Sequence, residues 1–278
     1  MNLPSTGDLR LQIARVARID ASQVERLRHE ALTIPRGWIA EYGDYQSGGW
    51  WTLSLLNETG RPEDVVIRDC TPVATTLLRL MPHTQRLLDG LHLRVMWARL
   101  ARLAANSFLW AHTDYDELAS VERYRLHVPL STNSSAYLTM GGAKVQLRTG
   151  CIWRLTPSFQ HGVCNLFGPD RIHLIIDCYA DENFRRLAAN AELAEDEVEP
   201  LPKLTERERE RHLSVARRLL ELDYVHAAET SLLRLFYSHR LEDGDVYGLI
   251  VRLYESAGRS ATAEGWRRKQ RMLLGEGR

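Results

Sequence analysis

The sequence contains no long apolar run, no excess of charge of either sign and no closely spaced cysteine pair. No stretch reaches the roughly 18 uninterrupted apolar residues that a membrane-spanning helix requires, and no basic segment followed by an apolar one opens the chain. The 36 Lys and Arg residues balance the 36 Asp and Glu residues, which argues against nucleic acid or an anionic membrane as the main partner. We therefore expect a cytoplasmic protein whose partner is a small molecule.

The cysteines are too scattered for a zinc knuckle, which needs closely spaced pairs. A disulfide framework belongs to much shorter secreted chains. We expect free thiols at the four positions, which are Cys70, Cys151, Cys164 and Cys178. With 278 residues the chain can bury a full core, and one large domain with a small appendage is the expected organisation.

Turn signals divide the region between residues 91 and 179 into short segments, several of which alternate apolar and polar residues. Such alternation is typical of half-buried strands. Strands at this short, regular spacing predict a sandwich or barrel and not a parallel α/β sheet. The six expected strands are Leu93–Leu103, Tyr124–Leu130, Ala136–Met140, Lys144–Arg148, Cys151–Leu155 and Ile172–Tyr179.

Further strands and two helices are expected nearer the start of the chain. Turn residues bound the strands, and a threonine followed by a proline is typical of a helix start. In chain order, we expect a strand at Leu9–Ile19, a helix capped by Asp20, strands at Gly48–Asn57 and Val65–Arg68, and a helix that begins at Thr71-Pro72 and ends near Leu88.

The composition changes after Asp181. The segment Ala191–Pro202 is acidic and ends in proline, which is typical of a solvated linker. Thr205 is followed three residues later by Glu208, the pattern of a capping box, and apolar residues then recur at helical spacing up to about Leu274. We therefore predict one domain at residues 1–190 and a C-terminal helical domain at residues 203–278.

The residue types that bind non-haem iron occur together in the strand-rich region. His112 and Asp114 form an HxD motif, and His161 follows 47 positions after the aspartate. Two imidazoles and one carboxylate occupy one face of a ferrous ion and leave three positions open for 2-oxoglutarate and O2. Taken alone, the HxD motif is better explained as a hydrogen-bonded loop, and His161 as a capped turn. Together they favour a metal site.

Arg171 completes this pattern, ten residues after His161. Its guanidinium can hold the distal carboxylate of 2-oxoglutarate through two parallel charge-assisted hydrogen bonds, which a lysine cannot form. A metal-binding cupin without redox turnover is the alternative from another class of protein. Such a protein would not need a dicarboxylate clamp, so Arg171 argues against it.

The sequence around these motifs resembles the aspartyl/asparaginyl β-hydroxylase family, and within it the bacterial L-proline cis-4-hydroxylases. The resemblance covers roughly residues 40 to 180 well and the helical tail more loosely. The matching text comprises Gly49-Trp50, Leu56-Asn57, Thr71-Pro72-Val73-Ala74-Thr75, Arg102, His112-Thr-Asp114-Tyr115, Arg125-Leu-His127-Val, His161 and Arg171-Ile-His173-Leu-Ile-Ile-Asp177. The serine that contacts 2-oxoglutarate in the animal members falls on Ala101 here, which favours the bacterial branch.

The resemblance implies a mainly β fold, a double-stranded β-helix (cupin-type jelly roll) with flanking helices. It implies iron(II) on His112, Asp114 and His161, with 2-oxoglutarate on Arg171. It also implies that an O2-dependent hydroxylation converts 2-oxoglutarate to succinate and CO2. Ascorbate is expected to help turnover in vitro, and the sequence leaves a homodimer open.

The resemblance also implies that Arg125 and His127 line the active site, where both side chains can donate to carboxylates. A surface arginine and a core histidine are the alternative. We expect His127 to contact the cosubstrate and Arg125 the substrate carboxylate. Asp116, or Glu117 beside it, is the expected acceptor for the substrate's ammonium group.

Trp50 or Trp110 is expected to form an apolar wall that sets the size of the substrate side chain, whereas each tryptophan taken alone is better explained as a core residue. The expected substrate is a free amino or imino acid, with proline or a close analogue as the leading candidate. The alternative is a hydroxylase of Asp, Asn or another residue in a peptide, protein or carrier-bound substrate. In the case of a protein substrate, the C-terminal helices would bind the partner.

Overall fold

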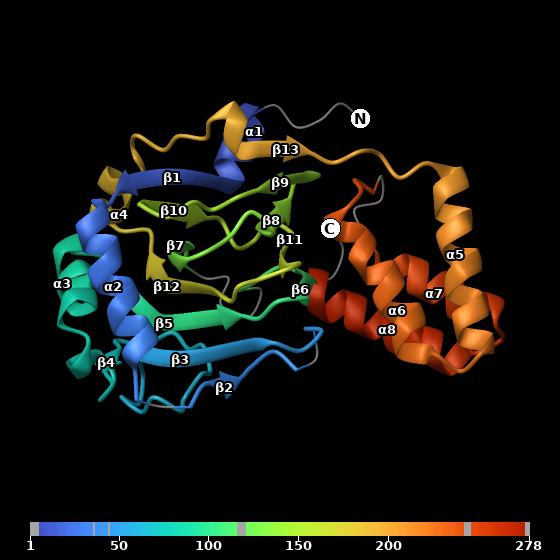
Figure 1. Cartoon of the computed structure of the whole chain (residues 1–278), viewed down its shortest axis with the longest axis horizontal. Helices are drawn as coiled ribbons and strands as arrows, with labels where there is room; N and C mark the ends of the chain where they lie inside the picture. Colours follow the sequence, from blue (N-terminus) through green and yellow to red (C-terminus); the bar gives the residue numbers. More distant parts are fainter. Residues whose placement is uncertain (1–5, 36, 44, 116–120, 242–245, 276–278) are drawn as a thin grey trace.

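The computed structural model describes residues 6–35, 37–43, 45–115, 121–241 and 246–275, which form two antiparallel sheets and flanking helices (Figure 1). The larger sheet has the order β1 (Ile13–Arg18), β10 (Cys151–Leu155), β7 (Arg123–Ser131), β12 (Arg171–Tyr179), β5 (Val95–Leu103), β3 (Trp50–Asn57) and β2 (Ile39–Ala40), with β4 (Val73–Ala74) paired to β3. The smaller sheet has the order β13 (Val198–Pro200), β9 (Ala143–Val145), β8 (Ala136–Met140), β11 (His161–Asn165) and β6 (Ser107–His112).

From β5 to β12 the chain passes repeatedly between the two sheets. Strands β5, β7, β10 and β12 belong to the larger sheet, whereas β6, β8, β9 and β11 belong to the smaller one. Eight strands that are distributed over two sheets in this way form a jelly roll. The predicted mainly β, cupin-type fold is therefore confirmed, with its flanking helices.

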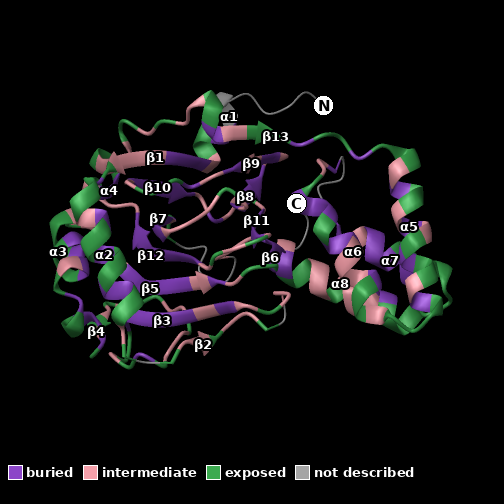
Figure 2. Ribbon diagram, viewed as in Figure 1, coloured by how far each residue is buried: buried purple, intermediate pink, exposed green. Residues whose placement is uncertain are grey.

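The larger sheet is buried on both faces, as Figure 2 shows for its central strands. Along β12, Ile172, Leu174 and Ile176 face an outer apolar cluster, while Arg171 and Ile175 line the space between the sheets. All nine residues of this strand are buried. The alternation of β12 thus directs polar groups into the interior of the jelly roll.

Helices α2 (Ala21–Thr33) and α3 (Pro82–Leu91) cover the outer face of the larger sheet, where Leu27 and Leu87 join its apolar cluster. Asp20 caps α2 as predicted and accepts a hydrogen bond from the Gln23 backbone N–H at 2.8 Å. Glu30 of α2 accepts from the free N–H groups at the start of α3. Two further short α-helices on this part of the chain are α1 (Thr6–Gln12) and α4 (Glu182–Ala188).

The C-terminal helices α5 (Glu206–Glu221), α6 (Val225–Leu233), α7 (Tyr247–Ser256) and α8 (Ser260–Leu274) lie beside β6 (Figure 1). The capping box of Thr205 and Glu208 is confirmed at the start of α5. The apolar cluster of these four helices includes Phe108 and Trp110 of β6. Among the described helices, none is long and apolar enough to cross a bilayer.

Several predicted elements differ from the structure. Leu9–Gln12 belongs to helix α1, and only the second half of the expected strand forms β1. Residues 65–68 form no strand, because the Asp64 side chain accepts from Val66 and Arg68 and closes a compact loop. Thr71-Pro72 does not start a helix, since Thr75 donates its N–H and hydroxyl to the backbone of β3 and keeps the chain extended. The helix begins at Pro82 instead.

The strands β6 and β11 were not among the predicted elements, and neither was β13. The segment expected to be a solvated linker contains β13, which pairs with β9 and extends the smaller sheet. The division of the chain into domains at residues 190 and 203 stays a prediction.

Candidate metal centre and active site

Two strands of the smaller sheet bring the expected metal ligands together. Strand β6 ends at His112 and β11 begins at His161, and the two histidines are register partners with ring centroids 4.4 Å apart. The Asp114 carboxylate follows directly, with Oδ1 3.8 Å from His112 Nε2 and Oδ2 3.5 Å from His161 Nε2. One donor atom from each residue lies within 4.8 Å of the other two.

Hydrogen bonds orient these side chains as metal ligands. His112 Nδ1 lies 2.7 Å from the Trp110 carbonyl oxygen, and His161 Nδ1 lies 2.9 Å from that of Phe159. With a proton on each Nδ1, both Nε2 lone pairs face Asp114. Support of this kind is typical of histidines that bind metals.

The protonation states also fit a metal ion. Burial lowers the pKa of His112, and it lowers that of His161 to about 3, so both imidazoles are neutral at physiological pH. Burial alone would raise the pKa of Asp114, but Coulombic interactions, of which that with the positive charge of Arg125 is the largest, outweigh burial and hold this pKa below its ordinary value. Two neutral imidazoles and one carboxylate are the donors of a mononuclear non-haem iron centre.

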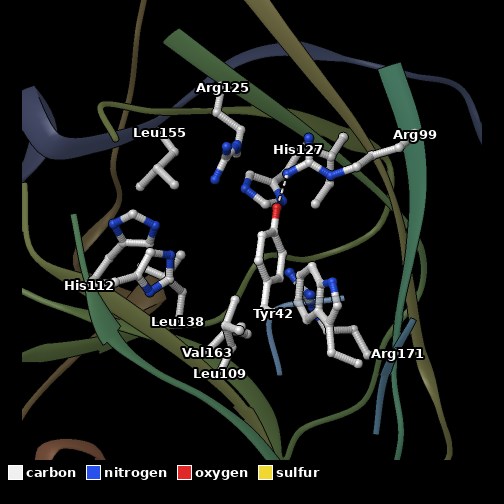
Figure 3. A pocket seen from close by; sticks show the side chains of 13 residues that line it. Tyr42, Arg99, Leu109, His112, Arg125, His127, Leu138, Leu155, Val163 and Arg171 are labelled. Atoms are coloured by element: carbon white, nitrogen blue, oxygen red, sulfur yellow. Dashed lines mark hydrogen bonds between the residues drawn. The ribbon is translucent and has the colours of Figure 1, made fainter. Parts of the chain in front are cut away.

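The cluster of metal ligands borders a cavity between the two sheets (Figure 3). Arg171 lies in the wall of this cavity. The Arg171 side chain is buried, and among the described residues no carboxylate pairs with it. Its Nη2 lies 2.8 Å from His173 Nδ1, whereas its Nη1 is buried without a hydrogen-bond partner. Burial lowers the pKa of Arg171 to about 9. A buried, unpaired guanidinium is costly unless a ligand supplies an anion.

His127 and His173 lie beside Arg171, on β7 and β12. Their Nδ1 atoms are 3.4 Å apart, and the Nε2 of each is buried without a partner. Buried polar atoms are normally hydrogen-bonded, so these two atoms fit a site that a polar ligand or an ordered water completes. His127 lines the cavity, and its contact with a cosubstrate stays a prediction.

Arg125 lies between two carboxylates of the protein. Its Nη1 donates to Asp114 Oδ2 at 2.5 Å and its Nε donates to Asp177 Oδ1 at 2.7 Å. Asp177 Oδ2 accepts from Arg99 Nη1 at 2.5 Å, and the Tyr115 hydroxyl also donates to Asp177. Arg125 is thus engaged in orienting a candidate metal ligand, whereas we expected it to be a free receptor for the substrate carboxylate. That role stays a prediction.

The buried charges of Asp177 and its two arginines make a prediction for stability. Asp177 is fully buried, so Asp177→Asn removes the charge that both Arg99 and Arg125 contact. Breaking such a pair should lower the free energy of unfolding by about 3–5 kcal/mol, measured by urea denaturation.

The matched control is Glu199→Gln, which breaks the ion pair between Lys144 and Glu199. Glu199 is largely exposed, so the expected loss is below about 1 kcal/mol. Equal losses in the two variants would contradict the structural role of Asp177.

A β-bulge places Trp110 outside the cavity. The register pairs His112 with His161 but Leu109 with Val163, so two residues of β6 oppose Gly162 alone. A bulge of this kind breaks the alternation of side chains along a strand.

In a regular strand Trp110 and His112 would share one face, which would place Trp110 in the cavity wall. In the structure Leu109 and His112 line the cavity, and Trp110 packs against the C-terminal helices. Trp50 does line the cavity. Asp116 and Glu117, the expected acceptors for the substrate, lie outside the described residues.

Sequence reasoning missed Tyr42, Arg99 and Asp177. Tyr42 and Arg99 line the cavity, and the Tyr42 hydroxyl lies 3.4 Å from Arg99 Nη2 (Figure 3). A usable signal existed for Arg99 and Asp177, because a charged residue between apolar neighbours in a strand is rarely buried without a partner. For Tyr42 we find no such signal.

The chain belongs to the aspartyl/asparaginyl beta-hydroxylase family, whose model matches residues 19–181, more than half of the chain. The predicted family and the predicted hydroxylase activity are thereby confirmed. The chain is 28% identical to L-proline cis-4-hydroxylase from Rhizobium meliloti over 242 residues, which cover 84% of this chain and 85% of the relative.

Two further proteins are similar to this chain. L-proline cis-3-hydroxylase 2 from a Streptomyces species is 25% identical, over 78% of this chain and 79% of the relative. A solved structure of a 2OG-Fe(II) oxygenase family oxidoreductase from Burkholderia pseudomallei aligns with a TM-score of 0.44 and 13% identity, over 64% of this chain and 92% of that chain.

Proposed function

We propose that the protein is an iron(II)- and 2-oxoglutarate-dependent hydroxylase of a free amino or imino acid, with proline or a close analogue as the leading candidate. The reaction would consume O2 and release succinate and CO2. One observation carries the proposal: the buried, unpaired guanidinium of Arg171 shares a cavity with the cluster of His112, Asp114 and His161. A metal site beside a receptor for an anion fits a chelating dicarboxylate cosubstrate.

Each residue has a distinct task in this proposal. His112, Asp114 and His161 would hold the iron, and Arg171 would bind the distal carboxylate of 2-oxoglutarate. With 2-oxoglutarate and O2, the bound iron supplies the oxidising chemistry that amino-acid side chains cannot provide. The protein contributes orientation: Arg125 fixes the Asp114 carboxylate, and the buried walls exclude water.

Two observations support a small substrate. The names of the two hydroxylases reported above give L-proline as their substrate. The described part of the cavity wall also presents apolar side chains, among them Trp50, Leu109 and Leu155, toward the cluster of metal ligands. Apolar walls of this kind suit an aliphatic or ring carbon as the site of hydroxylation and discriminate one methylene by only about 1–3 kcal/mol.

A second candidate is a residue within a peptide or carrier-bound substrate. The ion pairs of Arg125 favour this candidate, because its guanidinium already donates to Asp114 and Asp177. A substrate without a free carboxylate would not require that guanidinium.

The test is a panel of free amino acids incubated with the enzyme, iron(II), ascorbate and 2-oxoglutarate. We expect proline or a close analogue to gain 16 Da and to stimulate succinate formation, with related amino acids turned over at graded rates. Uncoupled succinate formation without a substrate serves as the baseline. Hydroxylation of a peptide or carrier-bound residue, with every free amino acid inert, would favour the second candidate.

A further inference from the structure

The bulge in β6 is held from outside by two tyrosines of the C-terminal helices. Tyr237 ends the short 3-10 turn η4 (Arg234–Tyr237) and donates its hydroxyl to the Leu109 carbonyl oxygen at 2.5 Å. Tyr247 begins α7 and donates to the Ala111 carbonyl oxygen at 2.6 Å. Both tyrosines are buried. The two hydroxyls therefore bind the backbone on either side of Trp110, just before His112.

The neighbouring strand β11 leaves room for the Tyr237 hydroxyl. Gly162 follows His161 and lies opposite the bulge. A Cβ at this position would lie 2.7 Å from the Tyr237 hydroxyl oxygen and 3.1 Å from the Leu109 carbonyl oxygen. Only a residue without a side chain leaves room for this hydrogen bond, so the Tyr237 contact lies directly between the two strands that carry the histidines.

A third contact reaches the HxD motif itself. Thr113 lies between His112 and Asp114, and its backbone N–H donates to the Leu273 carbonyl oxygen near the end of α8 at 2.7 Å. The helical segment thus hydrogen-bonds the backbone both before and within the motif. These contacts come from residues beyond position 181, where the match to the family model ends.

We propose that the C-terminal helices position the metal centre, and that Tyr237 and Tyr247 are the positioning residues. They hold the β-bulge that turns His112 toward the cavity. Neither tyrosine is among the residues that line the cavity, so each acts through the backbone of β6. The inference rests on the metal centre of the proposed function and assigns a role to the helical segment.

The test compares Tyr237→Phe and Tyr247→Phe with the wild type as full-length, metal-free protein. Mn(II) is titrated and the free ion is followed by electron paramagnetic resonance, which requires no turnover. Removing groups that orient metal ligands typically weakens binding by about 10- to 100-fold, and we expect a loss on the order of 10-fold for each variant. Amide hydrogen exchange should also accelerate in peptides that cover residues 107–113.

Tyr254→Phe is the matched control. The Tyr254 hydroxyl donates to Glu229 Oε1 at 2.6 Å, a contact within the helical segment that does not involve β6. Tyr254 is as buried as Tyr237, so the control removes a comparable hydroxyl. We expect its Mn(II) affinity and its exchange in residues 107–113 to match the wild type. Phenylalanine keeps the ring packing in all three variants, and thermal melts establish that each is folded.

The outcomes separate this inference from the function on which it rests. A wild type that does not bind Mn(II) contradicts the metal centre itself. If the wild type binds Mn(II) and both β6-directed variants bind it equally well, the positioning role is overturned. A loss in Tyr254→Phe as large as in the other two would also overturn it, because the effect would then be one of general stability.

Discussion

Arg171→Ala is expected to raise the KM for 2-oxoglutarate by roughly 30- to several-thousand-fold. Truncating one partner of a desolvated charge pair costs about 2–5 kcal/mol, and the Arg171 guanidinium is buried without a carboxylate of the protein to pair with it. The apparent affinity for iron should change far less, because Arg171 contacts none of the three candidate ligands in the described structure. Steady-state succinate formation at varied 2-oxoglutarate and at varied iron measures both constants.

Arg171→Lys is the control for geometry. It keeps the positive charge but loses the planar fork, so we expect only partial recovery of the affinity for 2-oxoglutarate. An unchanged KM in Arg171→Ala would mean that another cation holds the cosubstrate. Arg99 is the first alternative, because among the described residues it is the remaining arginine in the cavity wall apart from Arg125.

His112→Ala and His161→Ala should each abolish iron-dependent turnover of 2-oxoglutarate while the fold is kept. Each substitution removes one of three protein ligands and should weaken iron binding by orders of magnitude. Anaerobic addition of iron(II) and 2-oxoglutarate should produce a weak visible charge-transfer band in the wild type only.

His226→Ala is the matched control, since His226 is exposed on α6, away from the cavity lining. It should retain the band and the activity of the wild type. A normal band in both ligand variants would contradict the assignment of the metal centre.

The metal ligands could be predicted from the sequence because few residue types bind iron and their spacing is partly local. His112 and Asp114 lie two residues apart, at the end of β6 and just beyond it. The strands that carry the ligands could not be predicted so well. In β6, four consecutive apolar residues replace an alternating pattern, because one face lines the cavity and the other meets the C-terminal helices.

The environment of Arg125 depends on pairings that are remote in sequence. Asp177 and Arg125 are register partners on β12 and β7, and Arg99 reaches the same carboxylate from β5 on the other side. No local pattern encodes this register. The position of Trp110 could not be predicted from the sequence either, because the single bulge in β6 moves this side chain to the other face of the strand.

The net charge of the cavity also has a thermodynamic consequence. The guanidinium groups of Arg99 and Arg125 face the carboxylates of Asp114 and Asp177, whereas Arg171 has no carboxylate partner among the described residues and lies beside neutral histidines. The charges of a ferrous ion and a doubly charged 2-oxoglutarate cancel, so binding both ligands leaves the net charge of the cavity unchanged. Binding either alone shifts it by two charges in a buried space, where such charges interact strongly. The two ligands should therefore bind with positive coupling, each raising the affinity for the other by the same factor.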